Sequence, residues 1–213
     1  MEVIFCDNQI LVVSKPAGLC TQPHPGSDRN LTDLAKAWVK KKYDKPGNVF
    51  LEPIHRLDKP VSGLVLFART SKALSRLQEM MRQRLIKKTY FAWVEGNLPE
   101  TEGTLEHHLF HDEHKARVVN ASHAEAKLAR LHYKLVERKE ERCFVEVNLE
   151  TGRYHQIRVQ FSAIGCPVVG DAKYGSSFPS KEEKIALHHG KLQFQHPVTK
   201  EALVFEGKGL FAL

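Results

Sequence analysis

Residues 128–149, LARLHYKLVERKEERCFVEVNL, decide the fold class, because apolar and polar side chains alternate along both halves of this stretch. Such alternation is typical of a β-strand that has one buried face and one wetter face. The charged residues 138–141 separate the two alternating runs. The stretch therefore predicts an antiparallel hairpin with its turn at 138–141.

Similar patterns on either side of this hairpin predict the rest of the fold. Apolar runs and turn residues predict hairpins at 3–13 and 192–205 and strands at 64–68 and 89–96. Apolar residues at helical spacing predict helices at 31–42, 71–88 and 155–164. Residues 97–125 are polar and rich in His, and we expect loops with short strands there.

No repeat, low-complexity segment or clear boundary interrupts the chain of 213 residues. We therefore expect one domain, residues 1–213, of the α+β class. Hairpins joined by helices favour a mixed, mainly antiparallel central sheet with flanking helices and loops, and we expect a cleft across that sheet.

The composition, 42% hydrophobic and 27% charged residues, is that of a globular protein, which excludes disordered and fibrous classes. No apolar run reaches the roughly 18 residues that span a bilayer. The first five residues, MEVIF, do not resemble a signal peptide. The four Cys residues form no CxxC pair, and we expect reduced thiols in a cytoplasmic protein.

Positive charge is concentrated in one part of the chain. The formal net charge is +7, but residues 29–90 alone hold 15 Lys and Arg against 5 Asp and Glu. Residues 71–88 contain six of these cations and one carboxylate, whereas an ordinary solvated helix face mixes both signs. The distribution favours a polyanionic partner, with an anionic membrane surface as the rival target.

Several common chemistries have no motif here. GxxxxGK[ST] and GxGxxG are absent, which disfavours a nucleotide cofactor, and GxSxG is absent, which disfavours a hydrolase nucleophile elbow. The residues His107, His108, His111 and His114 have helical spacing but lack the HExxH pattern. We expect no metal and no cofactor, and keep a metal site at these His residues as the minor alternative.

Two polar segments carry candidate chemistry. The first, HRLD at 55–58, places a carboxylate beside an arginine just before a buried strand. The second, GRYHQIR at 152–158, follows a strand and opens a helix. It provides Arg153 and Arg158, which suit phosphate or carboxylate binding. The two segments lie about 100 residues apart in sequence, so only folding can unite them.

These segments resemble the RluA-like family of RNA pseudouridine synthases. The resemblance spans about residues 12–205, and HRLD followed by GRxHQIR is its most specific part. Four positions depart from the usual pattern: Val61 replaces a common Thr, Tyr154 a Thr or Ser, Gln160 a His and His189 an Ala. The other matching segments are VSKPAGL at 13–19, SG at 62–63, KTY at 88–90, GD at 170–171, YG at 174–175, LH at 187–188 and HP at 196–197.

The resemblance implies isomerisation of uridine in RNA to pseudouridine without a cofactor. It assigns Asp58 as the essential carboxylate, which acts either as a nucleophile or by deprotonating the sugar. Arg158 would pair with Asp58 and fix its orientation. Tyr90 would stack on the target base.

The resemblance also implies contacts to the substrate, and the basic stretch implies contacts to the RNA backbone. Arg56 would reach phosphate near the flipped nucleotide, and Ile157 would pack on the base or, equally, in the core. We expect His55 and Arg153 to bind substrate as well. The expected RNA-backbone contacts are Arg82, Arg84, Lys87 and Lys88.

The implied partner is RNA, namely a tRNA or rRNA stem-loop, because the chain begins with the catalytic strands and lacks the extra N-terminal RNA-binding domain of many relatives. We expect a cytoplasmic monomer with no obligatory protein partner and no membrane contact. Two other classes stay open. One is a non-catalytic RNA-binding domain, and the other is a metal-dependent nuclease that uses Asp58, Glu150 or Asp171.

Overall fold

The computed structural model describes residues 1–178, 180 and 183–207, and the chain folds into two compact units. The first unit contains residues 1–87 and 189–207, and the second contains residues 88–188. The chain passes from one unit to the other inside two strands, β5 (Lys87–Glu95) and β10 (Leu187–Gln195). The expectation of one domain stays a prediction.

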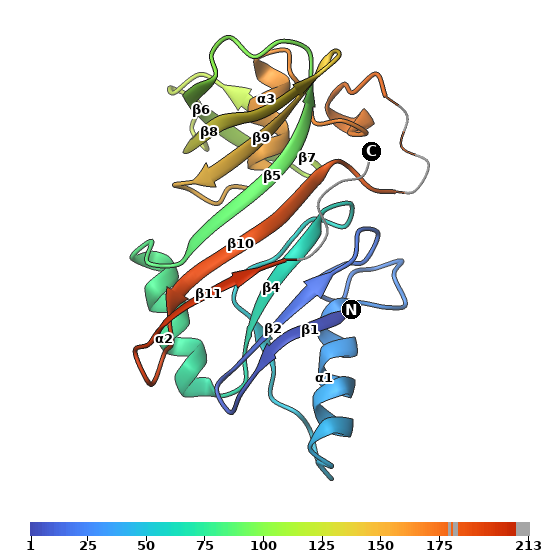
Figure 1. Cartoon of the computed structure of the whole chain (residues 1–213), viewed down its shortest axis with the longest axis vertical. Helices are drawn as coiled ribbons and strands as arrows, with labels where there is room; N and C mark the ends of the chain where they lie inside the picture. Colours follow the sequence, from blue (N-terminus) through green and yellow to red (C-terminus); the bar gives the residue numbers. More distant parts are fainter. Residues whose placement is uncertain (179, 181–182, 208–213) are drawn as a thin grey trace. The chain divides into compact units, whose positions relative to one another are not determined.

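The first unit is a sheet with the helices α1 and α2 (Figure 1). Its strands follow the order β1-β2-β4-β10, with β11 paired to β10 and the short β3 paired to β4. The hairpins expected at both ends of the chain are confirmed as β1–β2 and β10–β11. The bounds in this unit are β1 Glu2–Cys6, β2 Ile10–Lys15, α1 Leu31–Lys42, β3 Glu52–Pro53, β4 Ser62–Ala68, α2 Ser71–Arg82 and β11 Ala202–Glu206.

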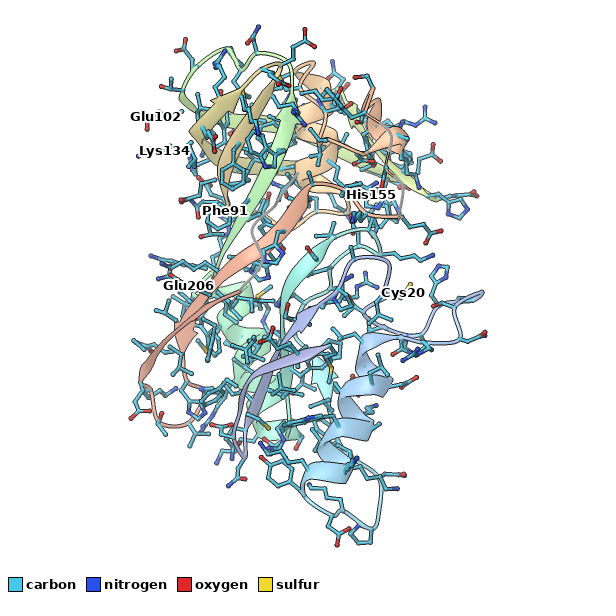
Figure 2. The ribbon with its side chains drawn as sticks, turned by 45° about the vertical axis from the view of Figure 1, so that its right-hand side comes forward. Cys20, Phe91, Glu102, Lys134, His155 and Glu206 are labelled. Carbon is cyan, nitrogen blue, oxygen red and sulfur yellow. The ribbon has the colours of Figure 1, made fainter. Side chains whose placement is uncertain are left out.

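The second unit is an antiparallel sheet in the order β5-β9-β8-β6-β7, accompanied by the helix α3. The hairpin at 128–149 is confirmed as β8–β9, and Glu102 and Lys134 lie opposite each other on β6 and β8 (Figure 2). The bounds are β6 Glu102–Asp112, β7 Lys115–Val119, β8 Lys127–Lys139, β9 Arg142–Leu149, α3 Gln156–Ala163 and the 3₁₀ turn η1 Ala172–Tyr174. The α+β class and the mainly antiparallel pairing are confirmed.

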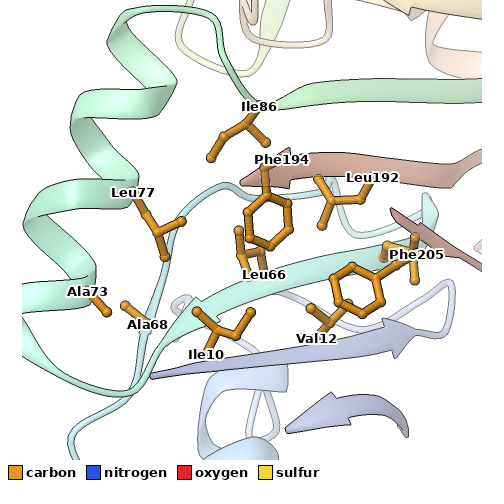
Figure 3. Packing of buried hydrophobic residues seen from close by; sticks show 11 residues of the cluster. Ile10, Val12, Leu66, Ala68, Ala73, Leu77, Ile86, Leu192, Phe194 and Phe205 are labelled. Carbon is orange, nitrogen blue, oxygen red and sulfur yellow. The ribbon is translucent and has the colours of Figure 1, made fainter. Parts of the chain in front are cut away.

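Strand β2 explains the core of the first unit. Ile10, Leu11, Val12 and Val13 are all fully buried, which requires cover on both faces of the strand. On one face, Ile10 and Val12 pack in a cluster with Ala73 and Leu77 of α2 and with residues of the neighbouring strands (Figure 3). The cluster also contains Leu64, Leu66, Ala68, Ile86, Leu192, Phe194 and Phe205.

The helix expected at 71–88 was wrong in extent. It ends at Arg82, since Arg84 has a left-handed φ of 57° and residues from Lys87 join β5. Leu85, which the helical pattern placed inward, is 54% exposed, whereas Ile86 enters the core. The cationic run continues past the helix, but strand pairing and burial of Ile86 outweigh helix propensity there.

Residues 97–125, where we expected loops with short strands, are mostly strand. β6 is 11 residues long and pairs with both β7 and β8. Its apolar alternation is weak, because His107 and His108 are both half-buried. Pairing with β7 and β8 stabilises β6 as a strand, although its own sequence pattern is weak.

Candidate active site

The carboxylate of Asp58 lies in a turn of the first unit between His55 and β4. The side chain is half-buried, and the backbone carbonyl of Asp58 accepts a hydrogen bond from the Val61 N–H at 3.0 Å. Its neighbour Leu57 is buried, whereas Arg56 is exposed. The turn therefore anchors one side chain in the core and leaves the carboxylate and the guanidinium beside it closer to solvent.

A single threonine holds the backbone beside this carboxylate. The Thr21 hydroxyl donates to the Leu57 carbonyl at 2.9 Å and accepts from the Leu57 N–H at 3.1 Å. The Thr21 carbonyl in turn accepts from the Thr32 hydroxyl of α1 at 2.7 Å. Both backbone groups of Leu57 are thereby fixed, which limits the movement of the adjacent Asp58 backbone.

A buried lysine holds the other side of the turn. Lys15 is fully buried, and its Nζ donates to the carbonyls of Pro16, Leu19 and Lys59 at 3.0, 2.7 and 3.2 Å. The Lys59 carbonyl also accepts from the Gly18 N–H at 2.8 Å. Burial lowers the pKa of Lys15 to about 8, while attraction to Asp58 opposes that change. Lys15 is thus a buried cation next to the candidate carboxylate.

His55 is buried in the same unit. Its Nε2 accepts from the Leu66 N–H of β4 at 3.3 Å, and its ring lies edge-on to His189 at 5.2 Å between centroids. The fully buried His189 contacts the Leu64 carbonyl through Nδ1 at 2.6 Å. The imidazole of His55 thus orients the start of the HRLD segment, and its role in binding substrate stays a prediction.

The second unit holds Arg158 rigidly. Arg158 is 4% exposed and donates to Asp171 twice, from Nε to Oδ2 at 2.6 Å and from Nη2 to Oδ1 at 2.9 Å. Asp171 is 1% exposed, and the ring of Tyr174 lies 5.0 Å from the Arg158 Cζ. This two-point geometry fixes the plane of the guanidinium.

The N-terminal end of α3 is built from aromatic and imidazole rings. His155, labelled in Figure 2, adopts a left-handed φ of 52°, and its Nδ1 lies 2.8 Å from the Tyr174 hydroxyl. Tyr154 stacks on His155 at 3.8 Å and also contacts His111 at 3.9 Å between ring centroids. Burial, together with the charges of Arg158 and Lys173, lowers the pKa of His155 to about 3, so this imidazole is neutral at pH 7.

The remaining candidates of the second unit lie in different environments. Tyr90 is 7% exposed on β5, opposite Val147 of β9. Ile157 is 4% exposed, in keeping with a core role, while Arg153 is exposed and donates from Nε to the Leu128 carbonyl at 2.9 Å. Asp58 lies in the first unit and Tyr90 and Arg158 lie in the second, so their meeting at one site stays a prediction.

Of the four expected RNA-backbone cations, Arg82, Arg84 and Lys87 are exposed and Lys88 is half-buried. Arg82 forms an exposed ion pair with Glu79, and its Nε lies 2.9 Å from the Glu79 carboxylate. Arg84 and Lys87 are exposed beyond the helix. Burial lowers the pKa of Lys88. Only part of the cationic run at 71–88 is therefore fully available to a polyanion.

The described part of the chain does not support the metal alternative. Within residues 1–178, 180 and 183–207 no group of three or more His, Cys, Asp or Glu side chains could hold a metal ion. Of the carboxylates considered for a nuclease, Asp171 is engaged by Arg158, and Glu150 contacts His132 and Arg130.

All four thiols are free. No helix among the described residues is long and apolar enough to cross a membrane.

The sequence did not predict the part that Thr21 and Lys15 play in holding the Asp58 turn, nor the pairing of Asp171 with Arg158, since Asp171 was considered only as one possible carboxylate of the nuclease alternative. Lys15 and Asp171 both lie inside segments that carry the family resemblance, and this position was the available signal. Thr21 lies outside those segments, in a loop that has no recognisable pattern.

Comparison with known proteins agrees with the sequence resemblance. Residues 9–163 match the family model for RNA pseudouridylate synthase. The chain is 33% identical to the dual-specificity RNA pseudouridine synthase RluA of Pasteurella multocida, over 99% of the chain and 94% of that protein. It is also 33% identical to the ribosomal large subunit pseudouridine synthase D of Nitrosomonas europaea, over 97% of the chain and 61% of that protein.

A solved structure shares the fold. Human RNA pseudouridylate synthase domain containing 4 aligns with a TM-score of 0.81 and 23% identity, over 97% of this chain and 88% of that one. At this identity the likeness concerns the fold alone, and it agrees with the α+β architecture described above.

Proposed function

The chain belongs to the RluA-like family of RNA pseudouridine synthases, and from this membership we propose that it isomerises particular uridines of structured RNA, in tRNA, rRNA or both. The class of enzyme is an isomerase. In the reaction the bond from C1′ to N1 breaks, the uracil turns, and C1′ bonds to C5. The proton of C5 is lost and N1 gains one, so no oxidant, reductant or energy source is consumed.

Asp58 is the proposed essential carboxylate, and the rigidity of its turn is the single observation that carries the proposal. Thr21 and Lys15 bind the backbone on either side of it, while its own side chain stays half-buried. A catalytic group needs a fixed position and access to substrate together. Either attack on C1′ or removal of a sugar proton requires the ionised carboxylate.

Arg158 is the proposed partner of Asp58. A guanidinium carries five N–H groups in a fixed fork, and the bonds to Asp171 are made through Nε and Nη2. A fork of this kind can bind two carboxylates at once, and we propose that Arg158 binds Asp58 while Asp171 orients it. Neutral His155 beside it adds no competing charge.

Tyr90 is proposed to stack on the flipped uracil, with Arg56, His55, Arg153 and Ile157 as further substrate contacts. Extrusion of a base from its stack costs a few kcal/mol, and least in loops and single strands. Exposed Arg56, close to Asp58 in the chain, suits a phosphate next to the flipped nucleotide. Phosphate contacts made by the basic part of the chain offset the cost of extrusion.

The partner is RNA, and we propose that the substrate is a stem-loop whose shape and unstacked bases give selectivity. The names of the relatives, which refer to a dual-specificity enzyme and to the large ribosomal subunit, support tRNA and rRNA as the classes to test. We further propose that residues 1–213 act as one catalytic domain, as a cytoplasmic monomer without an obligatory protein partner. The four free thiols support the cytoplasmic placement.

Two measurements test the reaction. Mass mapping of pseudouridine in RNA from cells with and without the gene should reveal at least one site that is lost with the gene. Purified protein should release tritium from transcripts that contain [5-³H]uridine, with equal rates in the presence and absence of EDTA. A rate that EDTA abolishes, or no release from tRNA or rRNA transcripts, would contradict the proposed reaction.

Asp58→Asn is the matched variant for this assay. Asn keeps the size of the side chain but cannot act as a nucleophile or base, so tritium release should fall by orders of magnitude. RNA affinity should stay within a few-fold of the wild type, because affinity depends mainly on phosphate contacts. Substantial release by Asp58→Asn would refute the assignment of the carboxylate.

A further inference from the structure

The C-terminal end of α1 carries a cluster of lysines that the proposed active site does not use. Lys40, Lys41, Lys42 and Lys45, here called the α1 basic end, are all exposed. Among the described residues, no carboxylate lies within ion-pair distance of any of them. Other exposed cations of the chain do form ion pairs, as Arg82 does with Glu79.

Helix capping explains only a part of this cluster. A cation in the last turn is favoured by the helix dipole, but the effect falls off within that turn. Several neighbouring lysines also repel one another when no anion is present. The arrangement fits an external polyanion that supplies the missing negative charge.

Aromatic rings are interleaved with these cations. The Lys42 Nζ lies 4.7 Å from the ring centroid of Trp38 and 5.7 Å from that of Tyr43. The Tyr43 side chain is 39% exposed, and its ring centroid also lies 4.4 Å from the Arg69 Cζ. Cations combined with exposed rings are typical of surfaces that bind single-stranded nucleic acid.

Helix α1 also connects the cluster to the Asp58 turn within one unit. Thr32, in its first turn, donates to Thr21, which holds the backbone of Leu57 next to Asp58. Lys41 lies nine residues after Thr32, which is about 14 Å along the helix axis. The first turn of α1 is therefore linked to the carboxylate turn through Thr32 and Thr21, and the other end of the same helix carries the basic cluster.

We propose that the α1 basic end is a second RNA contact, which holds the phosphate backbone of the segment that flanks the target uridine. This inference rests on the proposed function, since it takes the RNA to be the substrate bound at Asp58. It extends the RNA surface beyond the cationic run at 71–88.

The test is a salt titration of binding to unmodified tRNA transcripts. In Lys40→Glu/Lys41→Glu the slope of log Kd against log salt should become shallower by about 1.4–1.8, which is about 0.7–0.9 per lost phosphate contact. The Kd at moderate salt should rise at least tenfold, and kcat/KM for tritium release should fall with it. Lys40→Gln/Lys41→Gln should flatten the slope equally without adding repulsion or a charge unfavourable to the helix end.

Lys134→Glu/Lys139→Glu is the matched control, because both lysines are exposed on β8 and the change in net charge is the same. It should leave the slope and the Kd near the wild type. An unchanged slope in both α1 variants, or an equal loss in the control, would overturn the proposal. If the α1 variants instead lose binding only to phosphatidylglycerol vesicles, the surface contacts membrane and the proposal is likewise wrong.

The two hypotheses fail in different ways. Absence of tritium release by the wild type contradicts the proposed function whatever the salt slopes are. Normal release by the wild type together with unaltered slopes in the α1 variants contradicts only the second RNA contact.

Discussion

Replacement of Lys15 by Met should change how the stability of the protein depends on pH. In the folded state the pKa of Lys15 is lowered from 10.5 to about 8, chiefly by burial. Between these two values the unfolded chain binds a proton at Lys15 that the folded chain does not. The free energy of unfolding of the wild type therefore rises with pH across this window.

The size of the effect follows from the two pKa values. Each pH unit between them is worth about 1.4 kcal/mol, so the full rise is about 3 kcal/mol. Below pH 8 Lys15 is charged in the folded and the unfolded chain, so the cost of burying the charge lowers the stability in full. Above pH 10.5 Lys15 is neutral in both states, and its effect on stability no longer changes with pH. Lys15→Met has no group that titrates, so its stability should lack this rise.

Urea unfolding at pH 7, 8, 9 and 10 measures the difference directly. The stability of the wild type minus that of Lys15→Met should increase by about 2 to 3 kcal/mol, most of the full linkage energy, over this range. The exposed control Lys134→Met should keep the rise of the wild type, because titrations elsewhere are common to all three proteins. If the free energies of unfolding of the wild type and Lys15→Met change with pH in parallel, burial does not lower the pKa of Lys15.

Two further substitutions test the packing around the candidate site. Gly63→Ala should destabilise the first unit by about 3 kcal/mol or more in thermal melts, because the added Cβ, at a φ of 122°, would meet the His189 carbonyl and lie 2.5 Å from the His189 nitrogen. The control Gly47→Ala should be near neutral in the same melts, because the space around Gly47 is open. Arg158→Ala should abolish tritium release and cost about 3–5 kcal/mol in urea unfolding, because Asp171 stays buried without its partner, and a variant as stable as the wild type would contradict that pairing.

The sequence was sufficient to predict the elements whose patterns are strong. The hairpin at 128–149 alternates along both of its halves, and the helix at 31–42 has the bounds that its apolar spacing predicts. The long strand β6 was missed because half-buried His107 and His108 break its alternation. The end of α2 was misplaced because the cations after Arg82 favour a helix, while the burial of Ile86 decides the structure.

The candidate site also has parts that the sequence predicts and parts that it does not. HRLD and GRxHQIR are local patterns, so they were visible in the sequence. The partners that fix them come from elsewhere in the chain: Thr21 lies 36 residues before Leu57, and Asp171 lies 13 residues after Arg158. No local pattern predicts which hydroxyl or carboxylate will fill such a position, because tertiary packing alone brings the groups together.

The two proposed charged groups are held by different means, and this difference decides how their variants should behave. Thr21 and Lys15 fix the backbone around Asp58, while its side chain stays half-buried. Loss of the Asp58 charge should therefore cost activity but little stability. Arg158 is fixed through its own side chain, by a buried carboxylate, so its removal costs both activity and stability. Because the backbone contacts set the position of Asp58, its carboxylate can exchange bonding partners during the reaction while the turn that carries it stays in place.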